Sequence, residues 1–433
     1  MLIGDLIVWP ENSLICQSRD AAYHPGITDD KKNRRNILVN GDGFGVSWYQ
    51  KSTEKGSCVF KFVTPAWSDR NLRNIGEHVS SSLIMAHIRA ASSGHDPFED
   101  CHVVAVENCH PFKHKRWTFM HNGSLPRFKS VKLALLNILS PVVFKGITGT
   151  TDSEHIFALF LHYLGSAGDE EVSLECFIAA VEQTMSMLLQ ICNAADIHDP
   201  CSLNLVFTDG INVVATRFRS GKEAPPSLYY NWGSDFVCQE GHFEAQNKDK
   251  SKNEIVISSA PLSRVDGLSE AEGNAYSIGQ WILMPQDHML VVEGSRQDVS
   301  VVKDVYLKHL DLKGFDFALR EISAYISPNV IPSPFRPSVE VERHHGLAKI
   351  WSGISTESSE CDAVVGSKSA RKGAWHCNRL RVVESRETSP RSSFTDWDVL
   401  SLQPNKISKA RGLAYLVGVP LLFVLVANIG STR

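Results

Sequence analysis

The chain has 433 residues, of which 43% are hydrophobic and 21% are charged, and its formal net charge is −4. This composition is typical of a globular protein with a sizeable core, and the length suits one large domain with appendages. The weak negative charge provides no basic field for a polyanion, so we expect no nucleic-acid partner. Ten scattered cysteines without a C-x-x-C pair favour free thiols in a reducing, cytoplasmic setting.

The first apolar run, residues 1–8, contains an early acidic residue and no basic flank, so it does not resemble a secretory signal. We interpret it as sequence from the interior of a domain, with the start codon lying inside that domain. Residues 40–45 form the glycine-rich run Asn-Gly-Asp-Gly-Phe-Gly between two apolar pieces, which is a strong turn signal. A nucleotide-binding loop would need a helix after the glycines, and a β-rich run follows instead.

Two strand-like segments end in polar residues. Residues 82–89 are an apolar run that ends at Arg89, and residues 117–123 alternate bulky and polar side chains before Asn122 and Gly123. Arg89 is interpreted either as the surface cap of a strand end or as a planar fork for a carboxylate. Asn-Gly is either a hairpin turn or an oxyanion hole made from an amide side chain and a backbone N–H.

Two helices are predicted from local signals. A helix over residues 151–164 follows from the capping-box spacing of Thr151 and Glu154 before an apolar run. Asp152, in its first turn, either stabilises the helix N-terminus or receives a substrate ammonium group. A second helix spans residues 173–192, where apolar residues recur at intervals of three and four and form one buried stripe.

Strands dominate the next part of the chain. The dipeptide Asp209-Gly210 separates two apolar segments, residues 203–207 and 211–216, in a hairpin pattern. Further strands are predicted at residues 228–232, 254–258 and 288–292. The order of strands, helices and then strands indicates a layered α+β domain rather than alternating βαβ units.

The C-terminal third changes in character. Residues 301–340 form a proline-containing extension, and residues 341–411 are a polar tail that we predict to be disordered. Residues 412–433 are apolar, but the apolar run is shorter than the roughly 20 residues that a spanning helix needs. Two interpretations therefore stay open for this end: a membrane tail anchor through residues 412–429, or an aberrant terminus.

Neighbouring cysteines and histidines raise the question of a metal. Cys101 precedes His102 and Cys109 precedes His110, but structural zinc sites usually pair ligands two to four residues apart. No pair of cysteines has this spacing. We therefore expect no metal and no other cofactor.

Five blocks, taken in order, resemble the class II (N-terminal-nucleophile) glutamine amidotransferases. The blocks are residues 40–45, Ala-His-Ile-Arg at 86–89, Glu-Asn-Cys-His-Pro-Phe at 107–112, Phe-Met-His-Asn-Gly at 119–123 and Thr-Thr-Asp-Ser-Glu at 150–154. The branch that looks most similar includes the amidotransferase-like subunit of the fungal glutathione-degrading complex. The resemblance covers roughly residues 1–300, which we take as the amidotransferase domain. It implies a four-layer αββα N-terminal-nucleophile hydrolase fold and cleavage of a γ-glutamyl amide through a thioester.

The resemblance also implies a role for each matching residue. Arg89 would hold the α-carboxylate of the glutamyl group and Asp152 its α-ammonium. Asn122 and Gly123 would form the oxyanion hole, and His110 would help to shape the pocket. A metallopeptidase-like protein subunit is the partner that this branch implies, and a γ-glutamyl small molecule such as glutamine or a glutathione-like peptide is the substrate.

The nucleophile departs from the family pattern. In the family it is a cysteine at the mature N-terminus, whose own α-amine acts as base. Here the first cysteine is Cys16, inside the chain. We expect the first strand and its nucleophilic cysteine to be missing, so that the chain as it stands cannot turn over glutamine. The alternative is a non-catalytic binding or regulatory subunit with the same fold.

Overall fold

The computed structural model describes most of the first 312 residues and one short segment near the C-terminus. The described residues are 1–20, 39–50, 56–90, 103–165, 171–246, 254–263, 269–270, 276–278, 280–295, 302–312 and 421–426. The predicted disordered tail at residues 341–411, most of the proline-containing extension, and Cys101 with His102 lie outside the described residues.

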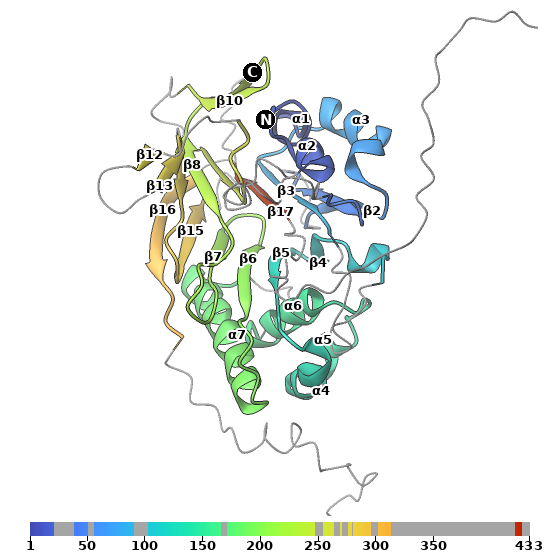
Figure 1. The fold of residues 1–433 in the computed structure, drawn as a ribbon, viewed down its shortest axis with the longest axis vertical. Helices are drawn as coiled ribbons and strands as arrows, with labels where there is room; N and C mark the ends of the chain where they lie inside the picture. Colours follow the sequence, from blue (N-terminus) through green and yellow to red (C-terminus); the bar gives the residue numbers. More distant parts are fainter. Residues whose placement is uncertain are drawn as a thin grey trace, which may run out of the picture. The chain divides into compact units, whose positions relative to one another are not determined.

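Two large antiparallel sheets form the centre of the described part of the chain (Figure 1). The nine-stranded sheet has the order β12 (Ser269–Glu270), β13 (Tyr276–Ile278), β14 (Trp281–Leu283), β8 (Tyr229–Gly233), β11 (Glu254–Ser258), β17 (Leu421–Val426), β3 (Leu83–Ile88), β1 (Phe44–Trp48), β2 (Cys58–Phe62). The six-stranded sheet has the order β16 (Val302–His309), β15 (His288–Gly294), β7 (Val213–Arg217), β6 (Ser202–Thr208), β5 (Trp117–Ser124), β4 (Phe112–His114). A hairpin of β9 (Phe236–Gln239) and β10 (His242–Ala245) stands beside them.

The two sheets pack face to face. Alternate residues of each strand point to opposite faces of the sheet, so each strand contributes side chains to two different cores. In β3, Met85 joins a buried cluster that also contains Met120 of β5 and Val206 of β6. Its neighbours Ile84 and Ala86 belong instead to the cluster that includes the N-terminal helices. The sheets therefore enclose one core between them, and each has a second core on its outer face.

Helices cover both outer faces. On the nine-stranded sheet lie α1 (Gly4–Ile7), α2 (Leu14–Arg19) and α3 (Arg70–His78), the last preceded by the short 3-10 turn η1 (Ala66–Ser68). On the six-stranded sheet lie α4 (Phe128–Ile138), α5 (Pro141–Phe144), α6 (Asp152–Tyr163) and α7 (Leu174–Ala194). A second 3-10 turn, η2 (Val106–Asn108), precedes β4. The order helix, sheet, sheet, helix confirms the predicted α+β, four-layer αββα fold.

Helices α6 and α7 lie where local sequence signals predicted them. Thr151 caps α6 by accepting from the Glu154 backbone N–H at 3.3 Å, as predicted. The other half of the capping box differs, because the Glu154 carboxylate accepts from the backbone N–H groups of Thr148 and Gly149 at 2.8 and 2.6 Å. Helix α7 is long and apolar enough to cross a membrane by composition, but 61% of its apolar 18-residue window is buried.

Three parts of the fold differ from expectation. Asn122 and Gly123 do not form a hairpin turn: β5 runs on to Ser124, and Gly123 pairs with Leu203 of β6. The six-stranded sheet continues past residue 300, where we expected the domain to end, because β16 pairs along β15. The apolar C-terminal segment, expected to be a tail anchor or an aberrant end, contributes β17 to the nine-stranded sheet.

Candidate functional site

The ends of β3 and β5 and the start of α6 are held together by side-chain hydrogen bonds. The His87 ring Nε2 lies 3.2 Å from the carbonyl oxygen of His121, so strand β3 is tied to strand β5 across the two sheets. His121 Nδ1 lies 3.0 Å from the Ser153 hydroxyl at the start of α6. The Asp152 carboxylate accepts from the Leu125 backbone N–H at 2.8 Å, just past the end of β5. The three polar-ended segments predicted from the sequence therefore converge.

Arg89 lies directly after β3 and is buried, with 5% of its surface exposed. Its Nη1 donates to the Val103 carbonyl at 3.4 Å, whereas its Nη2 has no hydrogen-bond partner in the described part of the chain. Burial lowers the pKa of Arg89, and the nearby Asp42 and Asp152 carboxylates oppose that shift. A guanidinium stays charged in proteins. A buried cation with a free donor is the arrangement that an anionic ligand would complete.

Asp152 is also buried, and its carboxylate has a structural role. One oxygen accepts from Leu125, and the other accepts from the backbone N–H of Ser153 at 2.7 Å and lies 3.3 Å from the Ser153 hydroxyl. The helix cap itself is Thr151 and not Asp152. A carboxylate offers about four acceptor positions, so Asp152 retains capacity for one further donor.

Asn122 and Gly123 lie next to each other in β5, opposite Asn204 and Leu203 of β6. Asn122 is fully buried; its Nδ2 donates to the Ser259 hydroxyl at 3.3 Å, and its Oδ1 is unpaired among the described residues. Gly123 has a φ of +152°, and a Cβ atom there would lie 1.9 Å from the Ser202 carbonyl oxygen. Only glycine fits this position, which leaves its backbone open to close approach.

His110 is buried beside His87, and the centres of the two rings are 4.2 Å apart. Neither ring nitrogen of His110 has a partner in the described part of the chain. Burial lowers the pKa of His87 to about 3, and burial together with the neighbouring histidines holds the pKa of His110 well below its usual value. Both rings are therefore neutral near pH 7. Unpaired buried nitrogens are rare in proteins and indicate contact with water or with a polar ligand.

Cys109 is the buried thiol next to this cluster. Its sulfur lies 3.5 Å from the Ala105 carbonyl oxygen and 3.7 Å from that of Phe62. Burial raises the pKa of Cys109, although the Arg89 and Lys61 cations act in the opposite direction. A reactive cysteine needs a lowered pKa and access to solvent. Cys109 is therefore a structural thiol, as its place in the core suggests.

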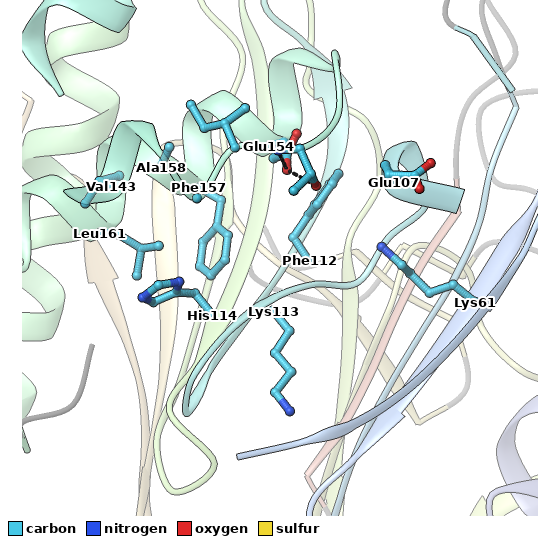
Figure 2. Close-up of a pocket in the computed structure, with 13 residues that line it drawn as sticks. Lys61, Glu107, Phe112, Lys113, His114, Val143, Glu154, Phe157, Ala158 and Leu161 are labelled. Atoms are coloured by element: carbon cyan, nitrogen blue, oxygen red, sulfur yellow. Dashed lines mark hydrogen bonds between the residues drawn. The ribbon is translucent and has the colours of Figure 1, made fainter. Parts of the chain in front are cut away.

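A cavity of about 180 Å³ lies between β4 and α6 (Figure 2). Apolar side chains, including Phe112, Phe157 and Leu161, line it together with Lys61 and Glu107. Lys61 Nζ donates to the Cys109 carbonyl at 2.8 Å and lies 5.3 Å from the centre of the Phe112 ring. None of the five candidate site residues (Arg89, His110, Asn122, Gly123 and Asp152) lines this cavity, so the cavity is not part of the candidate site.

Sequence reasoning did not assign a role to the residues that link the site. His121 joins β5 to α6 through Ser153 and to β6 through the Ser202 carbonyl, 3.0 Å from its Nε2. Ser259, after β11, positions the Asn122 amide. These contacts depend on which strands neighbour one another across the sheets, and the sequence carried no signal for that. Among the described residues, no group of three His, Cys, Asp or Glu is arranged to hold a metal ion.

Comparison with known proteins gives a consistent set of similarities. The model of the glutamine amidotransferases class-II family matches residues 31–295. The probable glutamine amidotransferase DUG3 of Saccharomyces cerevisiae is 32% identical over 306 residues, which cover 67% of this chain and 78% of the yeast protein. A γ-glutamyl-hercynylcysteine sulfoxide hydrolase of Mycobacterium tuberculosis is 24% identical over 29% of this chain and 45% of its own length. A class-II glutamine aminotransferase domain structure from Silicibacter pomeroyi aligns with a TM-score of 0.41 at 24% identity, covering 62% of this chain and 92% of that one.

Proposed function

The chain belongs to the class II glutamine amidotransferases, and from that premise we propose that it binds the γ-glutamyl group of a small molecule where β3, β5 and α6 meet. The observation that carries the proposal is the buried Arg89 guanidinium, whose Nη2 is unpaired among the described residues and which lies within electrostatic reach of Asp152. A buried cation that interacts electrostatically with a carboxylate offers one group for the carboxylate and one for the ammonium of an α-amino acid.

The proposed orientation of the ligand uses each site residue once. Arg89 pairs with the α-carboxylate, in the bidentate geometry that a planar guanidinium allows. Asp152 accepts a hydrogen bond from the α-ammonium. The γ-carbonyl oxygen then lies toward Asn122 and Gly123, where an amide N–H and a backbone N–H would stabilise negative charge on it. His110 packs against the ligand as a neutral ring.

The reaction that we propose is hydrolysis of a γ-glutamyl amide, in glutamine or in a glutathione-like peptide. A thiolate attacks the γ-carbonyl carbon, the C–N bond breaks, and the amine leaves with a proton; water then releases glutamate from the thioester. The names of the yeast and mycobacterial relatives support this substrate class. The described site residues supply binding and oxyanion stabilisation, and Cys109 does not supply the thiolate, because it is buried and its pKa is raised. A metallopeptidase-like partner subunit stays a prediction.

A second candidate function is that of a subunit that binds γ-glutamyl ligands without cleaving them. It is favoured by the buried, unreactive character of Cys109, the described thiol that neighbours Arg89. Glutamate release from glutathione and glutamine distinguishes the two functions in a protein that binds L-glutamate. Covalent labelling by a glutamine-analogue chloroketone, read by mass spectrometry, identifies any cysteine that acts as the nucleophile.

Calorimetric titration with L-glutamate tests the binding proposal directly. Arg89→Lys keeps the charge but removes the planar fork, so we expect the affinity to fall by about 1–3 kcal/mol, or roughly 5- to 150-fold. Arg127→Lys is the matched control, because Arg127 pairs with Asp199 at 2.9 Å on the exposed surface. Equal affinities for the wild type and Arg89→Lys would remove Arg89 from the site.

A further inference from the structure

The cavity between β4 and α6 has mostly apolar walls and lies outside the candidate γ-glutamyl site (Figure 2). Its apolar lining residues belong to the core under the outer helices of the six-stranded sheet or pack against it; they are Phe112, Val143, Ile147, Phe157, Ala158 and Leu161. An apolar protein cavity of about 150 Å³ is large enough to bind benzene. A volume of about 180 Å³ therefore holds a molecule the size of a benzene ring with a short arm.

The two carboxylates in the lining do not form a buried anionic site. Glu154 is buried, but its carboxylate already accepts from the Thr148 backbone N–H at 2.8 Å, the Thr148 hydroxyl at 3.0 Å and the Gly149 backbone N–H at 2.6 Å. Glu107 is exposed on η2, so water hydrates its carboxylate and weakens its field. Neither residue therefore leaves a desolvated negative charge for a cationic ligand.

The two lysines in the lining differ in their partners and directions. Lys113 is exposed, its ammonium donates to the Ser57 carbonyl, and Figure 2 shows its side chain extending away from Phe112 and Phe157. Lys61 is half-buried in β2, and its ammonium is directed toward the Phe112 ring, 5.3 Å from the ring centre. Lys61 is thus the cation that faces the apolar walls.

The Lys61 ammonium has donors to spare. An ammonium carries three N–H donors, and one of them is used by the Cys109 carbonyl at 2.8 Å. Within the described part of the chain, no carboxylate forms an ion pair with Lys61. Burial lowers the pKa of Lys61, although Cys109, Glu154 and Glu107 act in the opposite direction. A partly desolvated cation with free donors is stabilised by an anionic acceptor.

We propose that this cavity is a second binding site, for a small monocarboxylate with a compact apolar ring or branched tail. Lys61 binds the carboxylate, and the tail packs against Phe157 and Leu161 of α6. This division of labour is typical of small-molecule sites, in which apolar walls provide contact area and a few polar groups fix the orientation. The site does not depend on the proposed γ-glutamyl binding.

Calorimetric titration of the full chain with phenylacetate tests the proposal. Phenylacetamide has nearly the same shape and no charge, and benzylamine carries the opposite charge. We expect phenylacetate to bind at least about tenfold more tightly than either of them, because only the carboxylate makes a charge-assisted hydrogen bond to Lys61. Equal affinities for phenylacetate and phenylacetamide, or tighter binding of benzylamine, would overturn the inference.

Two lysine variants test the assignment of the charge. Lys61→Met keeps the length of the side chain and removes its charge, so it should weaken phenylacetate binding at least about tenfold. Lys113→Met makes the same change in a lysine of the same cavity whose ammonium is held by Ser57, and it should leave the affinity within about twofold, as for an exposed charge. Equal losses in the two variants would show a general charge effect and would contradict the role of Lys61.

A measurement on the unmodified protein covers the case in which Lys61→Met does not fold. Acetic anhydride acetylates lysines, and peptide mass spectrometry reads the rate at each one. Saturating phenylacetate should slow acetylation of Lys61 and leave that of Lys113 unchanged. An unchanged rate at Lys61 would overturn the inference.

L-Glutamate separates this site from the γ-glutamyl site. Saturating L-glutamate should leave the affinity for phenylacetate unchanged, and competition between the two would contradict a second site. If the chain binds phenylacetate through Lys61 but does not bind L-glutamate, the proposed function fails and this inference stands.

Discussion

Replacing Gly123 by alanine is expected to destabilise the protein far more than an ordinary glycine-to-alanine change. An added Cβ would lie 1.9 Å from the Ser202 carbonyl oxygen and 2.6 Å from its carbon, and these are backbone atoms of the neighbouring strand β6. Strands β5 and β6 would have to separate locally before the contact became tolerable. His121 Nε2, 2.9 Å from the same Cβ, would also have to move.

The magnitude follows from two terms. Loss of two or three ladder hydrogen bonds costs about 1 kcal/mol each, and a positive φ in a non-glycine residue costs about 1–2 kcal/mol. We therefore expect Gly123→Ala to lower the free energy of unfolding by about 3–5 kcal/mol. Gly165 is the matched control: its φ is +74°, and no atom lies within 4 Å of an added Cβ. Gly165→Ala should cost only the backbone term, about 1–2 kcal/mol.

Urea unfolding followed by circular dichroism measures the free energy of unfolding of the two variants. An unchanged dependence of this free energy on urea concentration indicates the same unfolding transition. A larger loss in Gly123→Ala is the expected result. Equal losses in the two variants would refute the claim that β6 leaves no room at Gly123, and with it the structural reason for glycine in the proposed oxyanion hole.

Three further predictions concern the buried polar groups. The pKa of His87 is about 3 in the folded protein and near 6.5 in the unfolded chain. Between these pH values the unfolded chain binds a proton at His87 that the folded protein does not. The free energy of unfolding therefore falls as the pH drops from 6.5 toward 3, by up to about 1.4 kcal/mol per pH unit. His110→Phe removes a second histidine of this kind, so the loss of stability between pH 6 and pH 4 should be smaller than in the wild type; an equal loss would show that His110 does not titrate as described. Cys192 and Cys201 have sulfur atoms 3.6 Å apart, so diamide should form a disulfide between them that peptide mass spectrometry detects, and their free thiols after treatment would contradict that geometry. Asp152→Asn should weaken L-glutamate binding at least tenfold in calorimetry, since it removes the charge opposite the ammonium, and unchanged affinity would exclude that role.

Much of the fold was predictable because its signals are local. The cap at Thr151 and the stripe of α7 each lie within one helix, the hairpin at Asp209-Gly210 joins two consecutive strands, and the structure contains all three. The αββα layering followed from the family resemblance rather than from periodicity. Buried strands such as β3 read as apolar runs in sequence, but nothing in such a run states which sheet contains it or which strands are its neighbours.

The parts that sequence reasoning missed depend on contacts between distant segments. Asn122 and Gly123 match a hairpin turn locally, but their pairing with β6 extends β5 through them. The last apolar segment is too short for a membrane helix, and its length suits a strand. Its pairing with β3 and β11 involves residues more than 150 positions away in the sequence, so the segment alone does not reveal it. The structure links the segments that carry Arg89, Asn122, Gly123 and Asp152, and the roles of these residues and of His110 in binding stay predictions.

The most direct test of the account is a crystal structure of the full chain with L-glutamate. We predict electron density for the ligand where β3, β5 and α6 meet, with its α-carboxylate on the Arg89 guanidinium, its ammonium on Asp152 and its side-chain carboxylate toward Asn122 and Gly123. Glutamate bound elsewhere, or bound here with its side-chain carboxylate on Arg89, would contradict the proposed site.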